Sequence, residues 1–211
     1  MLIRALCCLL TLAAAPAAAG DDTFEAPVSK LIGKAVIDPA REDLGRIAEL
    51  VVDTRNERVR YAVLSLGGWF GGGEKRFAVP LHALTPAPYN GRLMLDRGRE
   101  HMLAAPGFDG AAWPGWDDEY WSGVDLWYGS DAQRLPASPR LARVTRLLGR
   151  EVVDRDGADA GEIRDLAINL ASRKVLFVAL DQGGEAPARL PLRLFLVPAD
   201  GADVVLNVRN P

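Results

Sequence analysis

The chain has 211 residues, 25 of them basic and 28 acidic, and a formal net charge of −3. A mildly acidic chain lacks the clustered Lys and Arg that hold phosphate backbones, which excludes nucleic acid as a general partner. Its two cysteines, Cys7 and Cys8, both lie close to the N-terminus.

The N-terminal segment has the layout of a secretory signal peptide. Met1 to Arg4 carries the positive charge, Ala5 to Ala15 is mostly apolar, and Ala17-Ala18-Ala19 precedes Gly20. This order predicts a signal peptide over residues 1–19 that is cleaved before Gly20. A retained membrane anchor is the alternative, but the apolar run is shorter than a bilayer span requires. We therefore expect an exported, periplasmic protein with no transmembrane segment, and with neither disulfides nor thiolate sites, because both cysteines leave with the signal.

The next part of the chain reads as a series of short strands. Asp43-Leu44-Gly45 supplies turn chemistry, and apolar residues alternate from Val59 onward with a period of two. Strands are predicted at Gly33–Asp38, Gly45–Asp53, Val59–Leu66, Phe77–Leu81 and Leu93–Asp96. Short strands separated by Gly and Pro turns are typical of a small all-β barrel or sandwich.

The same pattern occurs twice. Residues 28–68 align without a gap to residues 144–184, and 13 of the 41 positions are identical. An ungapped match of this length indicates duplication, and two copies with a long spacer indicate tandem domains. We expect repeat 1 at 28–104 and repeat 2 at 144–210. The strand Val175–Leu180 is apolar on both faces, which predicts burial on both sides.

The first copy carries five extra residues, Trp69 to Gly73, inside a Gly-rich loop. A phosphate-binding loop would end in Gly-Lys-Ser/Thr and lead into a helix, and this loop does neither. A hairpin tip that displays Trp69 and Phe70 explains it better, and exposed aromatics often anchor interfaces. Both residues are therefore candidate interaction residues, unless their rings fold back over the barrel.

The segment 105–143 between the repeats is an aromatic connector, preceded by a short helix expected at Arg97–Ala104. Flexible linkers do not concentrate bulky aromatics, so this segment should be docked. One interpretation is a strap that fills the groove between the repeats; the other is a binding platform for a partner. The candidate interaction residues for the second are Trp113, Trp116, Tyr120, Trp121 and Trp127.

The order of motifs resembles one known family. Leu-Ile-Gly-Lys-x-Val-x-Asp at 31–38 is followed by Gly-x-Ile-x-x-Leu-x-x-Asp at 45–53, Val-x-Tyr-Ala-Val-Leu at 59–64 and Val-Pro-Leu at 79–81. This pattern resembles the PRC-barrel, a fold shared by the cytoplasmic domain of the photosynthetic reaction-centre H subunit and a domain of a ribosome maturation factor. The resemblance implies two tandem PRC-type β-barrels with little helix, and it brings no catalytic residues. This chain lacks the membrane helix of the first relative and the RNA-facing domain of the second.

No cluster of residues stands out as a catalytic or metal site. Asp154 to Asp159 resembles a calcium loop but lacks its ligand spacing. His82 and His101 are the only histidines, and neither has a recognisable partner for a metal or a catalytic triad. We therefore expect a protein that is not an enzyme and has no cofactor or metal.

Two functions remain open after these exclusions. The first is a protein-interaction or assembly module of the cell envelope, whose partners are envelope proteins. The alternative is a carrier of a small apolar or quinone-like ligand held between a barrel and the connector. A hydrolase that depends on His82 is a third hypothesis, with less support from the residues.

Overall fold

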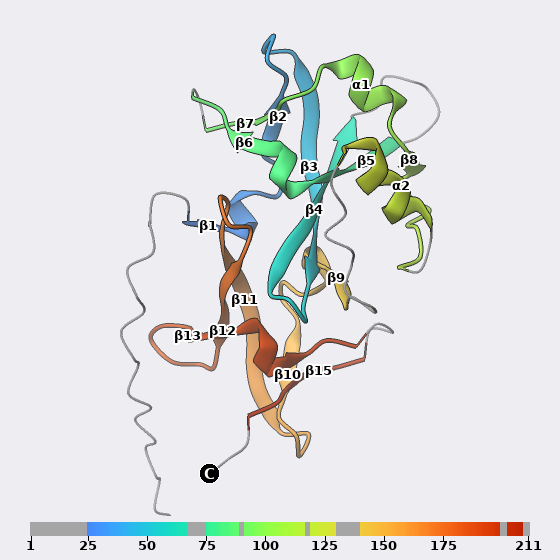
Figure 1. Cartoon of the computed structure of the whole chain (residues 1–211). Coiled ribbons are helices and arrows are strands. Elements are labelled where there is room, and N and C mark those ends of the chain that lie inside the picture. The colour runs from blue at the N-terminus through green and yellow to red at the C-terminus, as the bar shows by residue number, and fades with distance from the viewer. Residues whose placement is uncertain are drawn as a thin grey trace, which may run out of the picture.

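The computed structural model describes residues 25–66, 75–88, 91–116, 119–129, 140–198 and 202–208. The predicted signal peptide and the pair Trp69-Phe70 lie outside these residues. Figure 1 shows two curved sheets, one formed mainly by the first half of the chain in blue to green and one mainly by the second half in orange to red. Among the residues that the structure describes, every helix is too short or too polar to cross a bilayer.

The first sheet has the strand order β6-β7-β2-β3-β4-β5-β8, and β9 pairs with the far end of β3. All its pairings are antiparallel except that of β2 with β7, which is parallel. Its strands are β2 (Ala35–Ile37), β3 (Asp43–Asp53), β4 (Arg58–Leu66), β5 (Lys75–Pro80), β6 (Leu84–Pro86), β7 (Leu93–Leu95), β8 (Gly107–Asp109) and β9 (Leu141–Arg143). The five strands expected in the first repeat are all present, and each of their ends lies within two residues of its predicted position.

The second sheet repeats this plan with the order β13-β12-β11-β10-β15-β14, and β1 pairs with β11. Its strands are β1 (Glu25–Pro27), β10 (Glu151–Val153), β11 (Asp159–Asn169), β12 (Val175–Asp181), β13 (Ala188–Leu190), β14 (Phe195–Leu196) and β15 (Val204–Leu206). Short 3-10 helices stand at equivalent places in the two halves: η2 (Val28–Lys30), η3 (Leu81–Ala83), η4 (Val144–Arg146) and η5 (Leu192–Leu194). The duplication seen in the sequence is therefore a duplication of topology.

Gly45 lies within β3, where the sequence predicted a turn. Its φ is 110°, and the pairing of β2 with β3 shifts register at this point, which marks a β-bulge. The turn itself lies earlier, at Asp38, whose carboxylate accepts a hydrogen bond from the Glu42 N–H at 2.8 Å. Gly161 repeats the bulge in β11 with a φ of 116°.

The first strand of each half joins the sheet of the other half. β1 pairs with β11, with Glu25 opposite Asn169, and β9 pairs with β3, with Leu141 opposite Asp53. These two pairings are equivalent under the 116-residue offset of the duplication. We call β1 and β9 the exchanged arms, because each half completes the other.

A second contact between the halves lies where β4 and β12 begin. The residues on the two sides of this contact are again related by the 116-residue offset, so the two halves meet around a local twofold axis. The contacts are Val59 N–H to Arg173 O at 2.9 Å, Val175 N–H to Glu57 O at 2.8 Å and an antiparallel bridge of Arg58 with Lys174.

Burial corrects one expectation about the strands. β12 was expected to be buried on both faces, but Leu176 is 43% exposed. In β4, by contrast, consecutive residues from Tyr61 to Leu64 are fully buried. The connector packs against β4 and β5 of the first sheet through Trp121 and Tyr120, whereas Leu176 of the second sheet stays open to solvent.

The connector holds more structure than the sequence predicted. Helix α1 (Arg99–Ala104) forms where a helix was expected, and β8 extends the first sheet. A second helix, α2 (Glu119–Trp127), forms in a stretch that was expected to be a loop. Its buried residues Trp121, Val124 and Asp125 follow the spacing i, i+3, i+4, which places them on one face, and Tyr128 just past its end is also buried.

Candidate functional site

Helix α2 is fixed to the first sheet by Trp121. This side chain is 1% exposed, and its ring centroid lies 5.0 Å from that of Tyr61 on β4. Its indole N–H donates to the Gly115 carbonyl at 2.9 Å, so the polar atom of the ring is satisfied inside the core. Trp121 is therefore a core residue. Although it was a candidate interaction residue, its side chain is not exposed to a partner.

Tyr120 ties the same helix to two further segments. Its hydroxyl accepts a hydrogen bond from the Ala78 N–H of β5 at 3.1 Å and donates to the Pro106 carbonyl at 3.3 Å. Burial raises the pKa of Tyr120 to about 12, so the hydroxyl keeps its proton at any physiological pH. Tyr120 is thus mainly a clamp between connector and sheet.

Trp113 and Trp116 form the outer part of the aromatic cluster. The Trp116 ring stacks on Trp121 with centroids 5.4 Å apart, and Trp113 packs edge-on against Phe108 at 5.2 Å. Both rings are only partly buried, so each keeps a surface that faces away from the first sheet.

Arg143 on the exchanged arm β9 links this cluster to both halves of the protein. Its guanidinium lies over the Trp113 ring, 4.1 Å from the centroid, a cation–π arrangement. Its Nε donates to the Glu49 carboxylate of β3 at 2.9 Å. Glu49 is fully buried and also accepts hydrogen bonds from the N–H and hydroxyl groups of Thr145. The carboxylate is therefore paired and hydrogen-bonded, as a buried charge must be.

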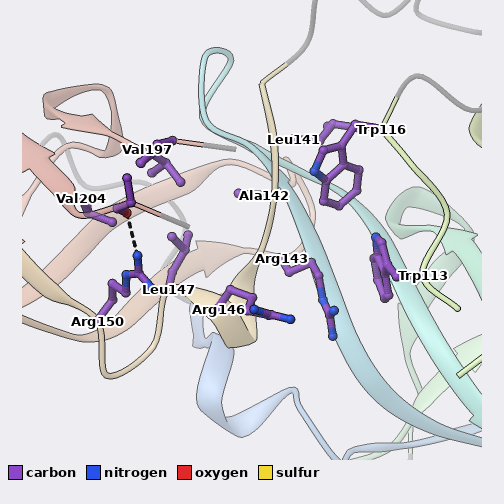
Figure 2. A pocket seen from close by; sticks show the side chains of 12 residues that line it. Trp113, Trp116, Leu141, Ala142, Arg143, Arg146, Leu147, Arg150, Val197 and Val204 are labelled. Atoms are coloured by element: carbon purple, nitrogen blue, oxygen red, sulfur yellow. Dashed lines mark hydrogen bonds between the residues drawn. The ribbon is translucent and has the colours of Figure 1, made fainter. Parts of the chain in front are cut away.

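A pocket of about 310 Å³ opens between this cluster and the second half of the chain. Trp113 and Trp116 line one side, Val197 and Val204 the other, and β9 with η4 forms the floor. Figure 2 shows Arg143, Arg146 and Arg150 along this floor, with Arg150 hydrogen-bonded on the side opposite the indoles. That bond runs from Arg150 to the Ala202 carbonyl at 2.6 Å.

A charged group lies beneath α2, on the same buried face of the helix as Trp121. Asp125 is buried and forms an ion pair with Arg60 at 3.8 Å, next to the buried hydroxyl of Tyr61. Burial raises the pKa of Asp125 above its usual value although Arg60 and His82 lower it. Burial, followed by the charge of Arg173, lowers the pKa of His82. Burial therefore disfavours the ionised form of Asp125, which lies within the contact between α2 and the sheet.

The remaining candidates for metal or acid–base chemistry have structural surroundings. His101 packs between Trp127 and Tyr128, with centroids 5.1 and 5.7 Å away. The carboxylate of Asp154 accepts the N–H groups of Asp156 and Ala158, both at 2.9 Å, and so closes a turn. Across the described ranges, no group of three or more His, Cys, Asp or Glu residues could hold a metal ion.

Comparison with known families agrees with this architecture. The family profile of the PRC-barrel domain matches the chain twice, at residues 25–102 and 139–210. The chain belongs to the PRC-barrel domain family. No curated protein matches it. Each PRC-barrel match begins at or just before an exchanged arm, so β1 and β9 are parts of their domains although each pairs with the opposite sheet.

The structure places the predicted interaction residues in three different settings. Trp121 is buried, Tyr120, Trp113 and Trp116 are half-buried, and Trp127 remains 38% exposed at the end of α2. Trp69 and Phe70 lie outside the described residues. The connector is therefore docked on the first PRC-barrel domain, whereas the strap expected from the sequence was to fill the groove between the two repeats.

The arginines of the pocket were missed at the level of sequence. They occupy positions 143, 146 and 150, where the first repeat has Pro27, Lys30 and Lys34. A change from Lys to Arg is conservative in charge and gives no signal by itself. Only the packing of β9 against the connector brings Arg143 next to Trp113.

Proposed function

We propose that this PRC-barrel protein is a non-enzymatic interaction or assembly module of the cell envelope, exported to the periplasm. One observation carries the proposal. Leu126, at the end of α2, is 83% exposed, and Trp127 next to it is 38% exposed. Isolated exposed apolar residues are common on protein surfaces, but an exposed Trp beside an exposed Leu on a rigid helix is typical of an interface anchor.

The packing of α2 against the first sheet supports this role. The helix is clamped by Trp121 and Tyr120, so Leu126 and Trp127 are presented in a fixed orientation. A rigid anchor loses little conformational entropy when a partner binds. The partner that fits is an envelope protein with an apolar recess for one indole ring.

The test is crosslinking and affinity capture of the protein from its own envelope fraction. We compare wild type with a Leu126→Ser, Trp127→Ala double variant and with Leu176→Ser, which removes an exposed Leu from the second domain instead. We expect one specific envelope protein that is captured by wild type and by Leu176→Ser but is lost with the double variant.

A Trp69→Ala, Phe70→Ala variant tests the other candidate anchor in the same experiment. Loss of the partner in this variant alone would move the interface to the Gly-rich loop. Equal capture by all four proteins, or no specific partner at all, would contradict the proposal.

Export is tested separately by the mass of the intact protein from the envelope. We expect a chain that begins at Gly20. A mass that still includes the apolar segment would contradict cleavage.

A further inference from the structure

The second sheet has a face that is more open to solvent than the equivalent face of the first sheet. In the first sheet, Tyr61 of β4 is fully buried with its ring against Trp121, and its neighbour Arg60 forms the ion pair with Asp125. Both side chains therefore face α2, which packs beside β5 in the upper sheet of Figure 1. Helix α2 thus covers this face of the first domain.

The equivalent residues of the second domain are apolar and exposed to solvent. They are Leu176 and Phe177 of β12, which correspond to Arg60 and Tyr61 under the 116-residue offset. Arg60 and Leu176 each stand at a register shift with the preceding strand, so the local backbone is also equivalent. Leu176 is exposed, and Phe177 is half-buried and, among the residues that the structure describes, lies outside the hydrophobic core. We call the surface formed by Leu176 and Phe177 the β12 face.

The two sheets also differ at the edge next to this face. β5 pairs with β8 of the connector, whereas its counterpart β13 is the last strand of the second sheet. The two α-helices among the described residues, α1 and α2, both precede the second domain in the chain. The connector thus covers a face and an edge of the first domain, and the second domain offers the same two surfaces to a partner.

Arg189 of β13 gives the β12 face its charge. Its side chain is exposed, and its guanidinium lies 4.6 Å from the centroid of the Phe177 ring. Within the described ranges, Arg189 forms no ion pair. Two copies of this face packed against each other would bring two such guanidinium groups together. The charge therefore favours an acidic partner over a second copy of this chain.

We propose that the β12 face docks an acidic, amphipathic helix of a partner protein, packed as α2 packs on the first domain. The Tyr120 side chain reaches Ala78 of β5, and Arg189 stands at the position equivalent to Ala78. The partner helix therefore carries an acidic residue at the place of Tyr120, which pairs with Arg189 and draws its guanidinium off the Phe177 ring. An aromatic residue follows at the place of Trp121 and packs on Phe177.

The third residue of the partner helix follows from a difference between the two domains. Asp125 of α2 meets Arg60, but the second domain has Leu176 at that position. An apolar residue therefore replaces the acid on the partner helix. The motif is an acidic residue, an aromatic residue directly after it, and an apolar residue four positions beyond the aromatic, which places both apolar groups on one face.

The test uses two fluorescently labelled peptides that span residues 113–129 of this chain. One has the natural sequence, and the other carries Tyr120→Glu and Asp125→Leu, which creates the motif. Fluorescence anisotropy measures the affinity of each peptide for the whole protein. We expect the altered peptide to bind about tenfold or more tightly, because the natural one places a carboxylate against Leu176 and no acid opposite Arg189.

Matched protein variants locate the binding site. Leu176→Ser should weaken the altered peptide about fivefold or more, whereas Leu196→Ser, which removes a Leu that is 40% exposed on β14, should leave its affinity unchanged. Arg189→Gln should weaken it about threefold and abolish the salt dependence of binding. Arg146→Gln removes another exposed guanidinium of the second domain and should have no effect.

Four results would overturn the proposal. They are no binding of the altered peptide, equal affinity of the two peptides, equal losses for Leu176→Ser and Leu196→Ser, and a wild-type dimer in sedimentation that Leu176→Ser dissociates. The last result would assign the β12 face to a second copy of this chain. The protein variants leave Leu126 and Trp127 in place, so failure here is distinct from failure of the partner proposed for α2.

Discussion

Two glycines at equivalent positions control how closely β4 and β12 approach the bulges. A Cβ added at Gly45 would lie 2.3 Å from the Ser65 carbonyl oxygen, and one at Gly161 would lie 2.1 Å from that of Asp181. Both residues also have a φ that side chains rarely adopt. Close contact with backbone and an unfavourable φ act together, so neither site tolerates alanine.

We predict that Gly161→Ala lowers the free energy of unfolding by about 2 kcal/mol or more, from strain and overpacking combined. Urea unfolding measures the change. Gly98→Ala is the control, because Gly98 has nothing within 4 Å of an added Cβ and should change stability by less than about 0.5 kcal/mol. Equal effects at the two positions would show that the bulge is not constrained.

Glu49 and Asp165 are equivalent residues with different burial. Each carboxylate accepts hydrogen bonds from the start of a 3-10 helix in the other domain, Glu49 from Thr145 and Asp165 from Ser29. Glu49 is fully buried and also pairs with Arg143, whereas Asp165 is half-buried. The same contact should therefore contribute unequally to stability.

Glu49→Gln should cost about 2–3 kcal/mol, because the buried guanidinium contact loses its counter-charge. Asp165→Asn should cost less than about 1 kcal/mol, since water screens that site. Chemical denaturation at neutral pH compares the two. A larger cost for Asp165→Asn would contradict the assignment of Glu49 as the central polar contact between the domains.

At the scale of elements, α2 is docked with a charged group beneath it. The pKa of Asp125 is raised in the folded protein, so the folded state binds this proton more tightly than the unfolded chain does. The stability that Asp125 contributes should therefore rise as the pH falls through the raised pKa. It should level off below the usual carboxyl pKa of 3.8 and be lost again as the pH rises.

Asp125→Asn removes this titration. We predict that wild type gains stability relative to Asp125→Asn when the pH is lowered from 7 toward 4. Urea midpoints at several pH values test it, with both proteins in a His82→Gln background so that the neighbouring histidine does not titrate. A difference that stays constant, or that changes in the opposite direction, would contradict the docking described for α2.

The elements show what the sequence can and cannot predict. The strands of both repeats were visible because apolar periodicity and Gly turns are local signals. Helix α2 was missed because its aromatic residues and Pro-rich surroundings resembled a loop, although Trp121, Val124 and Tyr128 carry helical spacing. The pairing of β1 with β11 could not be predicted, since a three-residue strand has no periodicity and its partner lies far along the chain.

At the scale of the whole molecule, the exchanged arms join the two domains. Each domain completes the sheet of the other, and the starts of β4 and β12 meet around the same local twofold axis. The pocket depends on this arrangement, because β9 carries Arg143 from the second domain to Glu49 and Trp113 of the first half. We therefore regard the two PRC-barrel domains as one cooperative unit.

The most direct test uses the position of the tryptophans. All five lie in the first repeat or the connector, at residues 69, 113, 116, 121 and 127, and the second domain has none. Tryptophan fluorescence thus reports on the first domain and connector, while far-UV circular dichroism reports on both domains. For Gly161→Ala, in the second domain, we predict that the two urea transitions shift together and remain coincident. A fluorescence midpoint that stays at the wild-type value while circular dichroism splits into two steps would contradict the exchanged-arm unit.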